Sequence, residues 1–218
     1  MIILIRIVAI VISLAIWHLT QKLLSRRNVL VGSDENATIT DGIHQLTARF
    51  NRWLLNHHRA ANGLLISSSL VIDMLGIYLL LSAILGRSIE PFLGLFMVFA
   101  LRQICQAFCP LPLPKGMIWR NPGIPSLLVT YGTSCDLFFS GHTAIAVYGA
   151  ATLAGNFGTL GIALGLGIAI FEIATVMILR AHYTMDVFTG IIAALYVHHL
   201  AVQFAPHVDL WIQHIARA

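Results

Sequence analysis

Long apolar segments alternate with short polar ones along most of the chain. The apolar segments occupy approximately residues 2–24, 63–85, 92–108, 138–157, 159–179 and 183–204. A helix needs about 20 apolar residues to cross the hydrocarbon core of a bilayer, and each segment comes near that length. The pattern therefore predicts an all-α membrane protein that is folded as a six-transmembrane helical bundle.

One long polar region, residues 25–62, separates the first apolar segment from the other five. Its first part has the composition of a loop. In its second part, apolar residues recur at steps of three and four, at Ile43, Leu46, Phe50, Trp53 and Leu54. This spacing predicts an amphipathic helix. Tryptophan and basic residues on such a helix are typical of a segment in the lipid head-group layer, and a cap packed on the loops is the alternative.

These segments predict a single integral membrane domain that covers residues 1–218. It begins with the first span at 1–24 and the polar loop with its amphipathic helix at 25–62. It continues with a five-span core at 63–204, which holds the candidate catalytic residues, and ends in a tail at 205–218. The first segment lacks a cleavage site of small residues, so we expect a retained span rather than a signal peptide.

The composition agrees with a membrane protein and limits the classes of ligand. Hydrophobic residues make up 58% of the chain and charged residues 10%, whereas soluble domains carry about 25% charged residues. The net charge of +4 is modest and the aqueous segments are few. This balance favours affinity for lipid head groups or phosphate over nucleic-acid binding.

Two short polar stretches stand at the entrances of apolar segments. Ser140-Gly141-His142-Thr143 opens the fourth segment, and His182-Tyr183-Thr184-Met185-Asp186 opens the sixth. Glycine lets the backbone approach an anion closely, and the N–H groups at a helix start point toward it. A histidine takes or gives a proton near neutral pH. Because consecutive spans alternate in direction, both stretches are expected on one face of the membrane, where they predict a single phosphate site.

The two histidines and the aspartate predict catalysis through a phosphohistidine. If the second stretch is helical, His182 and Asp186 share a face as residues i and i+4. The carboxylate then holds one ring nitrogen and leaves the other free to attack phosphorus. His142 protonates the departing alcohol and deprotonates the incoming one. The alternative for His182 is a histidine that is hydrogen-bonded at the membrane interface.

Six further residues are candidates for binding the substrate at the same face. The start of the fourth span offers a phosphate cradle, and an arginine within the third span is costly there unless it contacts an anion. A carboxylate in the loop before the fourth span either binds a cationic head group, orients His142 or is simply solvated. The six are Ser140, Gly141, Asp136, Arg102, Lys115 and Arg180.

The two motifs resemble those of a known family. Residues 136–143 and 182–187 resemble the signature motifs of the sphingomyelin synthases, as do 101–104 and the proline-rich 111–116. Residues 40–195 are also similar to the plant phosphatidylcholine:diacylglycerol cholinephosphotransferases, including the stretch Arg49-Phe50-Asn51-Arg52. Both groups belong to the lipid phosphate phosphatase (PAP2) superfamily. The resemblance implies six spans in a PAP2-like bundle.

The resemblance also implies a site chemistry and an orientation. It implies a triad of His142, His182 and Asp186 without metal or other cofactor. It further implies cytosolic termini and a site that faces the lumen or periplasm. The count of lysines and arginines gives the opposite orientation, because most of them lie on the side of the site and the positive-inside rule places that side in the cytosol.

Departures from the family patterns distinguish between the candidate reactions. Ser134-Cys135 stands where the synthases show Cys-Gly, and His199 does not match their closing Tyr-His. Val176 stands where the phosphatases show an arginine, and Lys115 and Arg120 lack the spacing of their basic motif. A phosphomonoester dianion would therefore miss its cationic clamp, whereas a phosphodiester carries one charge fewer.

We therefore expect a lipid phosphotransferase. It moves a phospho-head group, such as phosphocholine, from a phospholipid donor to diacylglycerol or ceramide, and both lipids enter from the bilayer. One alternative is a PAP2-type lipid phosphate phosphatase, in which water replaces the acceptor alcohol. The other is a non-catalytic bundle that binds or transports lipids, in which the histidines and the aspartate come together incidentally.

Overall fold

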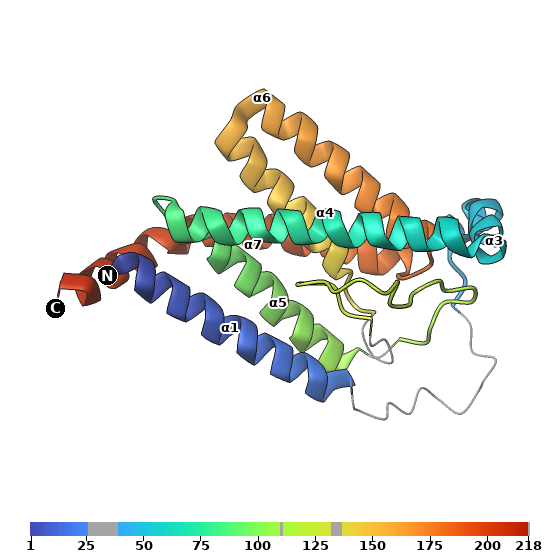
Figure 1. Cartoon of the computed structure of the whole chain (residues 1–218), viewed down its shortest axis with the longest axis horizontal. Helices are drawn as coiled ribbons and strands as arrows, with labels where there is room; N and C mark the ends of the chain where they lie inside the picture. The colour runs from blue at the N-terminus through green and yellow to red at the C-terminus, as the bar shows by residue number, and fades with distance from the viewer. Residues whose placement is uncertain (26–38, 110, 132–136, 218) are drawn as a thin grey trace.

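The computed structural model of the chain describes residues 1–25, 39–109, 111–131 and 137–217 (Figure 1). Within these ranges the chain forms helices α1 (Ile2–Ser25), α2 (Gly42–Leu46), α3 (Ala48–Asn56), α4 (His58–Leu85), α5 (Glu90–Phe108), α6 (Gly141–Ile178) and α7 (Thr184–Arg217). Among the described residues, 5 helices are long and apolar enough to cross a membrane, namely α1, α4, α5, α6 and α7. The prediction of an all-α integral membrane protein is thus confirmed.

Helix α6 contains both the fourth and the fifth predicted spans. The helix is broken at Gly158, whose backbone angles are φ 55° and ψ −132°. Positive φ is accessible to glycine without steric cost, and the chain reverses there, so that α6 rises and returns in Figure 1. A Cβ added to Gly165 would lie 2.7 Å from the Cα of Ala150, which shows how closely the two arms approach. The six separate helices of the prediction are therefore replaced by five long helices, one of which is folded back.

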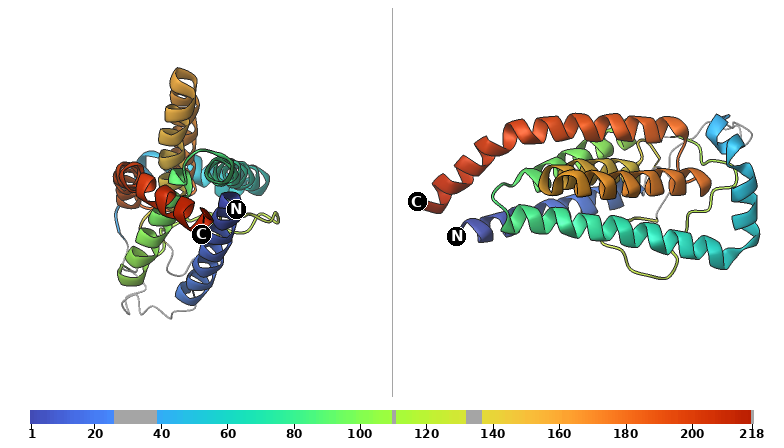
Figure 2. Two further views of the ribbon diagram at one scale, coloured as in Figure 1. Left: turned by 90° about the vertical axis from the view of Figure 1, so that its left-hand side faces the viewer. Right: turned by 90° about the horizontal axis from the view of Figure 1, so that it is seen from above.

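The predicted amphipathic helix is two short helices, α2 and α3, that meet at Thr47. Helix α3 crosses the end of the bundle and lies nearly perpendicular to α4 (Figure 2). Of the predicted apolar stripe only Leu54 is buried, whereas Phe50 is 62% exposed and Trp53 51% exposed. The buried Asn51 fixes α3 instead, because its Nδ2 donates to the carbonyl oxygens of Gly116 at 3.0 Å and of Ile178 at 2.9 Å.

The predicted tail is part of helix α7, which continues through Pro206 to Arg217. Proline removes one helical hydrogen bond and bends the helix, and α7 bends near its C-terminal end in Figure 2. Packing keeps the last turns folded. The buried Asp209 pairs with Arg6 of α1, with 2.7 Å between Oδ1 and Nη2, and Ile212 packs against Ile10 in a separate small core.

The main core joins all the long helices and lies beside the two motifs. It contains Trp17 of α1, Ile72 of α4, Phe99 of α5, Tyr148 of α6 and Val197 of α7. Many large apolar side chains point outward from the same helices, as expected for surfaces that face lipid. Examples, which are between 46% and 71% exposed, are Leu4, Met74, Phe96, Leu160, Ile170 and Leu195.

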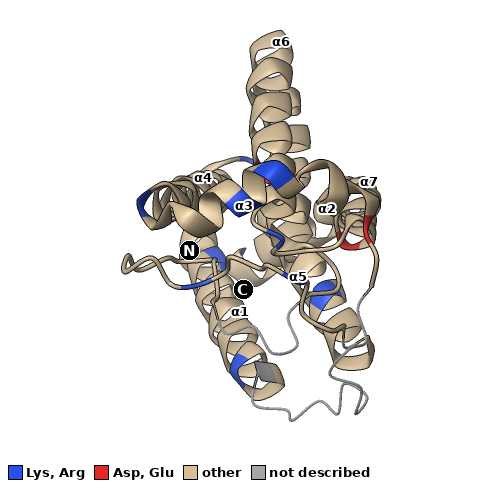
Figure 3. Ribbon diagram, turned by 90° about the vertical axis from the view of Figure 1, so that its right-hand side faces the viewer, with Lys and Arg blue, Asp and Glu red and all other residues tan. Residues whose placement is uncertain are grey.

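The two ends of the bundle differ. Both chain ends lie at one end, and α2 and α3 lie at the other (Figures 1 and 2). Figure 3 looks onto the second end and shows lysine and arginine positions on α3, on the start of α4 and on the loops. The fold therefore places α2, α3, the basic positions on α3 and at the start of α4, and the entrance of α7 together, away from the chain ends.

Candidate active site

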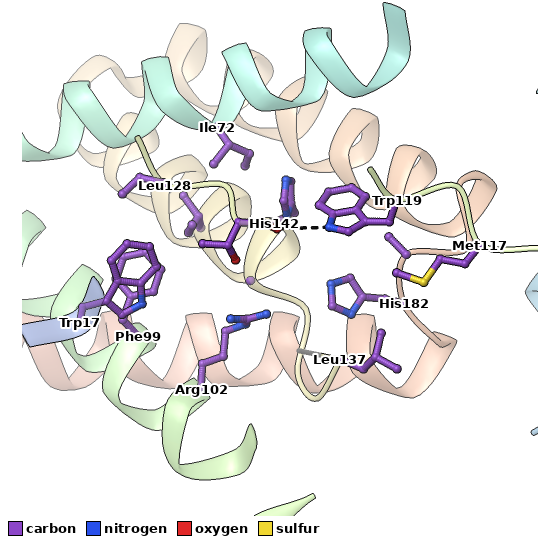
Figure 4. A pocket seen from close by; sticks show the side chains of 14 residues that line it. Trp17, Ile72, Phe99, Arg102, Met117, Trp119, Leu128, Leu137, His142 and His182 are labelled. Carbon is purple, nitrogen blue, oxygen red and sulfur yellow. Dashed lines mark hydrogen bonds between the residues drawn. The ribbon is translucent and has the colours of Figure 1, made fainter. Parts of the chain in front are cut away.

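A small cavity at the α2/α3 end of the bundle brings the two sequence motifs together (Figure 4). Its volume is about 30 Å³, which accommodates water. The walls come from α1, α4, α5, α6, residues 111–131 and the segments before α6 and α7. They include Trp17, Ile72, Phe99, Arg102, Met117, Trp119, Leu128, Thr130, Leu137, Gly141, His142, Ile145, Ala181 and His182. A ligand as large as a lipid head group requires these walls to move apart.

His182 lies between the cavity and a buried carboxylate. Its Nδ1 is 3.6 Å from Oδ2 of Asp186, and the two side chains are 6% and 1% exposed. Such a distance is longer than a hydrogen bond, although catalytic hydrogen bonds are often long before substrate binds. His182 precedes α7, which begins at Thr184, so a turn rather than a helical face brings the ring to the carboxylate. The arrangement leaves Nε2 of His182 as the nitrogen that is not held by Asp186.

The carboxylate of Asp186 also organises the backbone around it. Its Oδ2 accepts a hydrogen bond from the N–H of Tyr183 at 2.8 Å. The carbonyl oxygen of Asp186 accepts from the N–H of Ser140 at 3.1 Å. These bonds connect the start of α7 to the start of α6, and they hold the two motifs in a fixed relation.

His142 stands in the first turn of α6 and faces the cavity from the opposite wall. Ser140 caps this helix, because its Oγ accepts from the N–H of Thr143 at 3.3 Å. The His142 ring packs edge-on against Trp119, with centroids 5.1 Å apart and planes at 87°. Its buried Nε2 has no hydrogen-bond partner within the described part of the chain. A nitrogen of this kind is suited to exchange a proton with a bound ligand.

Arg102 completes the polar lining from α5. It is 7% exposed, and its Nε donates to the carbonyl oxygen of Phe139 at 2.9 Å. In Figure 4 its guanidinium and the His182 ring point into the same space. A Cβ on Gly141 would lie 2.9 Å from that Nε, so glycine is what lets the guanidinium approach the start of α6. The site thus combines a cation, two histidines and a helix N-terminus.

Three other predicted binding residues, Ser140, Lys115 and Arg180, do not line this cavity. Ser140 is fully buried and acts as the cap of α6. Lys115 and Arg180 line a second, open hollow of about 240 Å³. There the Arg180 guanidinium donates to the backbone carbonyls of Lys115 and His44. Asp136 lies outside the described residues.

Asp41 and His44 support the site, although neither was among the predicted site residues. The Asp41 carboxylate accepts from the N–H and the Oγ1 of Thr184, both at 2.7 Å, so it caps α7 as well as α2. Nε2 of His44 donates to the carbonyl oxygen of His182 at 2.9 Å. An aspartate before a short helix is an N-cap signal, which makes Asp41 recognisable in retrospect. His44 carries no comparable signal.

The capping bonds also determine the ionisation of Asp41. Partial burial raises the pKa of its carboxyl, but hydrogen bonds from Thr184 and His44 stabilise the charged form more strongly. As a result, the pKa of Asp41 lies below its usual value. Asp41 is therefore a charged cap for both helices near neutral pH.

Three polar residues within the apolar segments also have defined partners. Asp73 of α4 accepts from Ser126 Oγ and from the N–H groups of Leu127 and Leu128, each at 2.9 Å, and so anchors the loop that forms one cavity wall. Glu172 accepts from Ser68 Oγ at 2.6 Å, outside the cavity. Gln103 of α5 donates to the Trp17 carbonyl oxygen at 3.0 Å.

Comparison with known proteins identifies the family. The model of the AtPDCT1/2 family matches residues 40–203, which include α2 to α6, most of α7 and every predicted catalytic residue. No curated protein matches the chain. No solved structure matches it either. The family match covers most of the chain, and the chain therefore belongs to the AtPDCT1/2 family, a family of phosphatidylcholine:diacylglycerol cholinephosphotransferases.

Proposed function

We propose that this membrane protein transfers phosphocholine from phosphatidylcholine to diacylglycerol through a phosphohistidine on His182. One observation carries the proposal: in a chain of a cholinephosphotransferase family, His182 lies between a buried carboxylate and a cavity that it shares with a second buried histidine. This is the arrangement that an oriented nucleophile and a separate acid–base group require.

In the first half-reaction, Nε2 of His182 attacks the phosphorus of phosphatidylcholine. A P–N bond forms, and the bond between phosphorus and the glycerol oxygen breaks. His142 donates a proton to this oxygen, so that diacylglycerol leaves as a neutral alcohol. Asp186 stabilises the positive charge that develops on the His182 ring.

In the second half-reaction, a new diacylglycerol takes the place of the first. His142, now neutral, accepts the proton of its hydroxyl group, and the oxygen attacks phosphorus. A P–O bond forms while the P–N bond to His182 breaks, which releases a new phosphatidylcholine and restores the enzyme. The two steps mirror each other, so His142 ends with the proton with which it began.

The remaining polar groups of the cavity act on the phosphoryl oxygens. The Arg102 guanidinium balances their negative charge, and Gly141 allows them to approach the first N–H groups of α6. His44 holds the His182 backbone from the other side. A transition state with charge on oxygen gains most from groups that are already positioned in this way.

We propose that the bundle crosses the membrane six times in a PAP2-like arrangement, with the termini in the cytosol and the site on the lumenal or periplasmic side. Two observations support an even number of crossings. The chain ends lie at the same end of the bundle (Figure 1), and α6 reverses at Gly158. Without that reversal, His142 and His182 would emerge on opposite sides.

The test uses purified protein in liposomes with phosphatidylcholine that is labelled in its choline head group. Diacylglycerol and ceramide are supplied as acceptors in parallel reactions, and the label is followed by thin-layer chromatography. We expect label to move onto diacylglycerol. Movement of the label onto ceramide instead would show a sphingomyelin synthase activity, and release of water-soluble phosphocholine would show hydrolysis. A His182→Ala variant that keeps transferring label would exclude the phosphohistidine.

A further inference from the structure

The first helix contributes an unused hydrogen-bond donor to the cavity. Trp17 of α1 lines the cavity and is 8% exposed. Its indole Nε1 has no hydrogen-bond partner among the residues that the structure describes. A buried tryptophan N–H usually finds a partner, and a buried donor without one is costly unless something else satisfies it. In Figure 4 the Trp17 side chain lies beside Phe99 at the edge of the cavity, so a ligand in the cavity is the available partner for this N–H group.

Contacts with α5 fix the Trp17 side chain in this place. Its ring lies 4.8 Å from the ring of Phe99, with 34° between the planes. Its carbonyl oxygen accepts from Nε2 of Gln103. Phe99, Arg102 and Gln103 are spaced by three and four residues on α5, so they share the face that α1 covers. The geometry therefore couples the indole to the helix that also supplies Arg102.

Packing alone does not account for a tryptophan at this position. A phenylalanine or leucine would serve the apolar contacts with Phe99 and would leave no donor unpaired. Residue 17 also lies outside residues 40–203, the part that the family model matches. The structure nevertheless places it in the same cavity as His142, His182 and Arg102.

We propose that Nε1–H of Trp17 donates a hydrogen bond to an oxygen of the bound lipid, so that α1 forms part of the active site. The proposal rests on the proposed function, because it assigns the cavity to a phospholipid and a diacylglycerol. Two kinds of oxygen present the same acceptor chemistry: a phosphoryl oxygen and the carbonyl oxygen of an acyl ester. Trp17 positions the substrate in both cases and takes no part in proton transfer.

The experiment removes the N–H without changing the shape of the side chain. Trp17 is replaced by benzothienylalanine, in which sulfur takes the place of the indole N–H, and Trp17→Phe is made in parallel. Trp211, which is 62% exposed on α7, receives the same benzothienylalanine replacement as the matched control. Each full-length protein is reconstituted in liposomes, and kcat and KM for transfer are measured with diester and diether lipids.

We expect the replacement at position 17 to lower kcat/KM by roughly 10- to 100-fold, the effect of one hydrogen bond to a substrate oxygen. The Trp211 control keeps its activity. If the acceptor is a phosphoryl oxygen, kcat of the benzothienylalanine protein falls equally for diester and diether lipids. If it is an ester carbonyl, KM rises for diester lipids only, and the unmodified protein already uses diether lipids poorly.

Unchanged kcat and KM in the folded benzothienylalanine protein would overturn the role of Trp17. Failure of the proposed function gives a different result, because the unmodified protein would then release water-soluble phosphocholine or leave the label in place. Thermal unfolding of each variant is measured alongside the kinetics. The proposal would also be overturned if each position-17 variant, Trp17→Phe included, lost stability and if kcat fell in proportion to that loss, equally for diester and diether lipids.

Discussion

His182 is the residue on which the covalent mechanism depends. We expect His182→Ala to abolish phosphocholine transfer, because the variant lacks the proposed nucleophile. The variant should also lose the acid-labile label that phosphatidylcholine labelled in phosphorus leaves on the original protein. His142→Ala should slow transfer by roughly 100- to 10,000-fold, as expected for loss of an acid–base group. The label is measured on protein that is quenched in base and separated from lipid.

His199→Ala provides the matched control for the histidine variants. His199 is exposed on α7, where its Nε2 lies 2.9 Å from the side-chain nitrogen of Gln203. This variant should transfer phosphocholine at the original rate. Persistent protein label in His182→Ala would assign the covalent bond to another residue.

Gly141 tests how closely Arg102 must approach the start of α6. The Cβ of Gly141→Ala would come within 2.9 Å of Arg102 Nε, so the guanidinium has to move away from the phosphoryl oxygens. We expect a lower kcat together with about 1–3 kcal/mol of destabilisation, the usual cost of overpacking. Gly167→Ala is the control in the same helix, because nothing lies within 4 Å of its new Cβ, and a thermal unfolding assay compares the two.

At the scale of single residues, the sequence predicted which polar residues meet where their positions follow from the spacing of the apolar segments. His142, His182 and Arg102 reach one cavity because the alternation of apolar segments requires it. Lys115 and Arg180 reach a neighbouring hollow instead, because their positions depend on loop geometry that no periodicity encodes. Trp17 was missed because its role depends on how α1 packs against α5.

At the scale of elements, Asp41 joins α2 to α7 and should link stability to pH. Loss of a cap costs about 1–2 kcal/mol, and Asp41→Ala removes the acceptor for both helices. The folded pKa of Asp41 lies below the usual 3.8. Its charge therefore stabilises the fold fully above that value, and this stabilisation is lost as pH falls through the folded pKa.

Thermal unfolding of the original protein and of Asp41→Ala measures this effect. We expect the difference in stability to be constant near neutral pH and to narrow once the pH falls below about 4. Asp41→Asn keeps an acceptor oxygen but no charge. The stability of this variant should lie between those of the original protein and Asp41→Ala, and residue 41 should then add little pH dependence. A difference that stays constant down to acidic pH would show that the charge of Asp41 does not stabilise the caps.

Element boundaries were predictable where backbone chemistry marks them. Gly158 was predicted as a break between apolar segments, and its positive φ produces the reversal of α6. The break at Thr47 has no glycine or proline to mark it, so the spacing of apolar residues predicted one helix where α2 and α3 are separate. The end of the last apolar segment at residue 204 did not predict the end of α7, because the ion pair between Asp209 and Arg6 holds the following turns against α1.

At the scale of the whole molecule, the reversal of α6 determines which positions share a side of the membrane. Six crossings place Thr159 near the reversal and His214 near the C-terminus on one side, and Leu46 of α2 on the other. Five crossings would separate His142 from His182, because the second arm of α6 would no longer return to the first. The shared cavity of the two histidines therefore depends on the reversal of α6.

Labelling of single cysteines tests this topology. Leu46→Cys, Thr159→Cys and His214→Cys are each introduced into a protein whose native cysteines, Cys105, Cys109 and Cys135, are replaced by serine. Sealed vesicles of known orientation are treated with a maleimide that does not cross membranes. We expect positions 159 and 214 to react from the cytosolic side and position 46 from the lumenal or periplasmic side. Protection of position 159 from the reagent on both sides would show that α6 turns back within the membrane. Labelling of position 46 from the cytosol would mean that the excess of lysine and arginine at the α2/α3 end sets the orientation by the positive-inside rule.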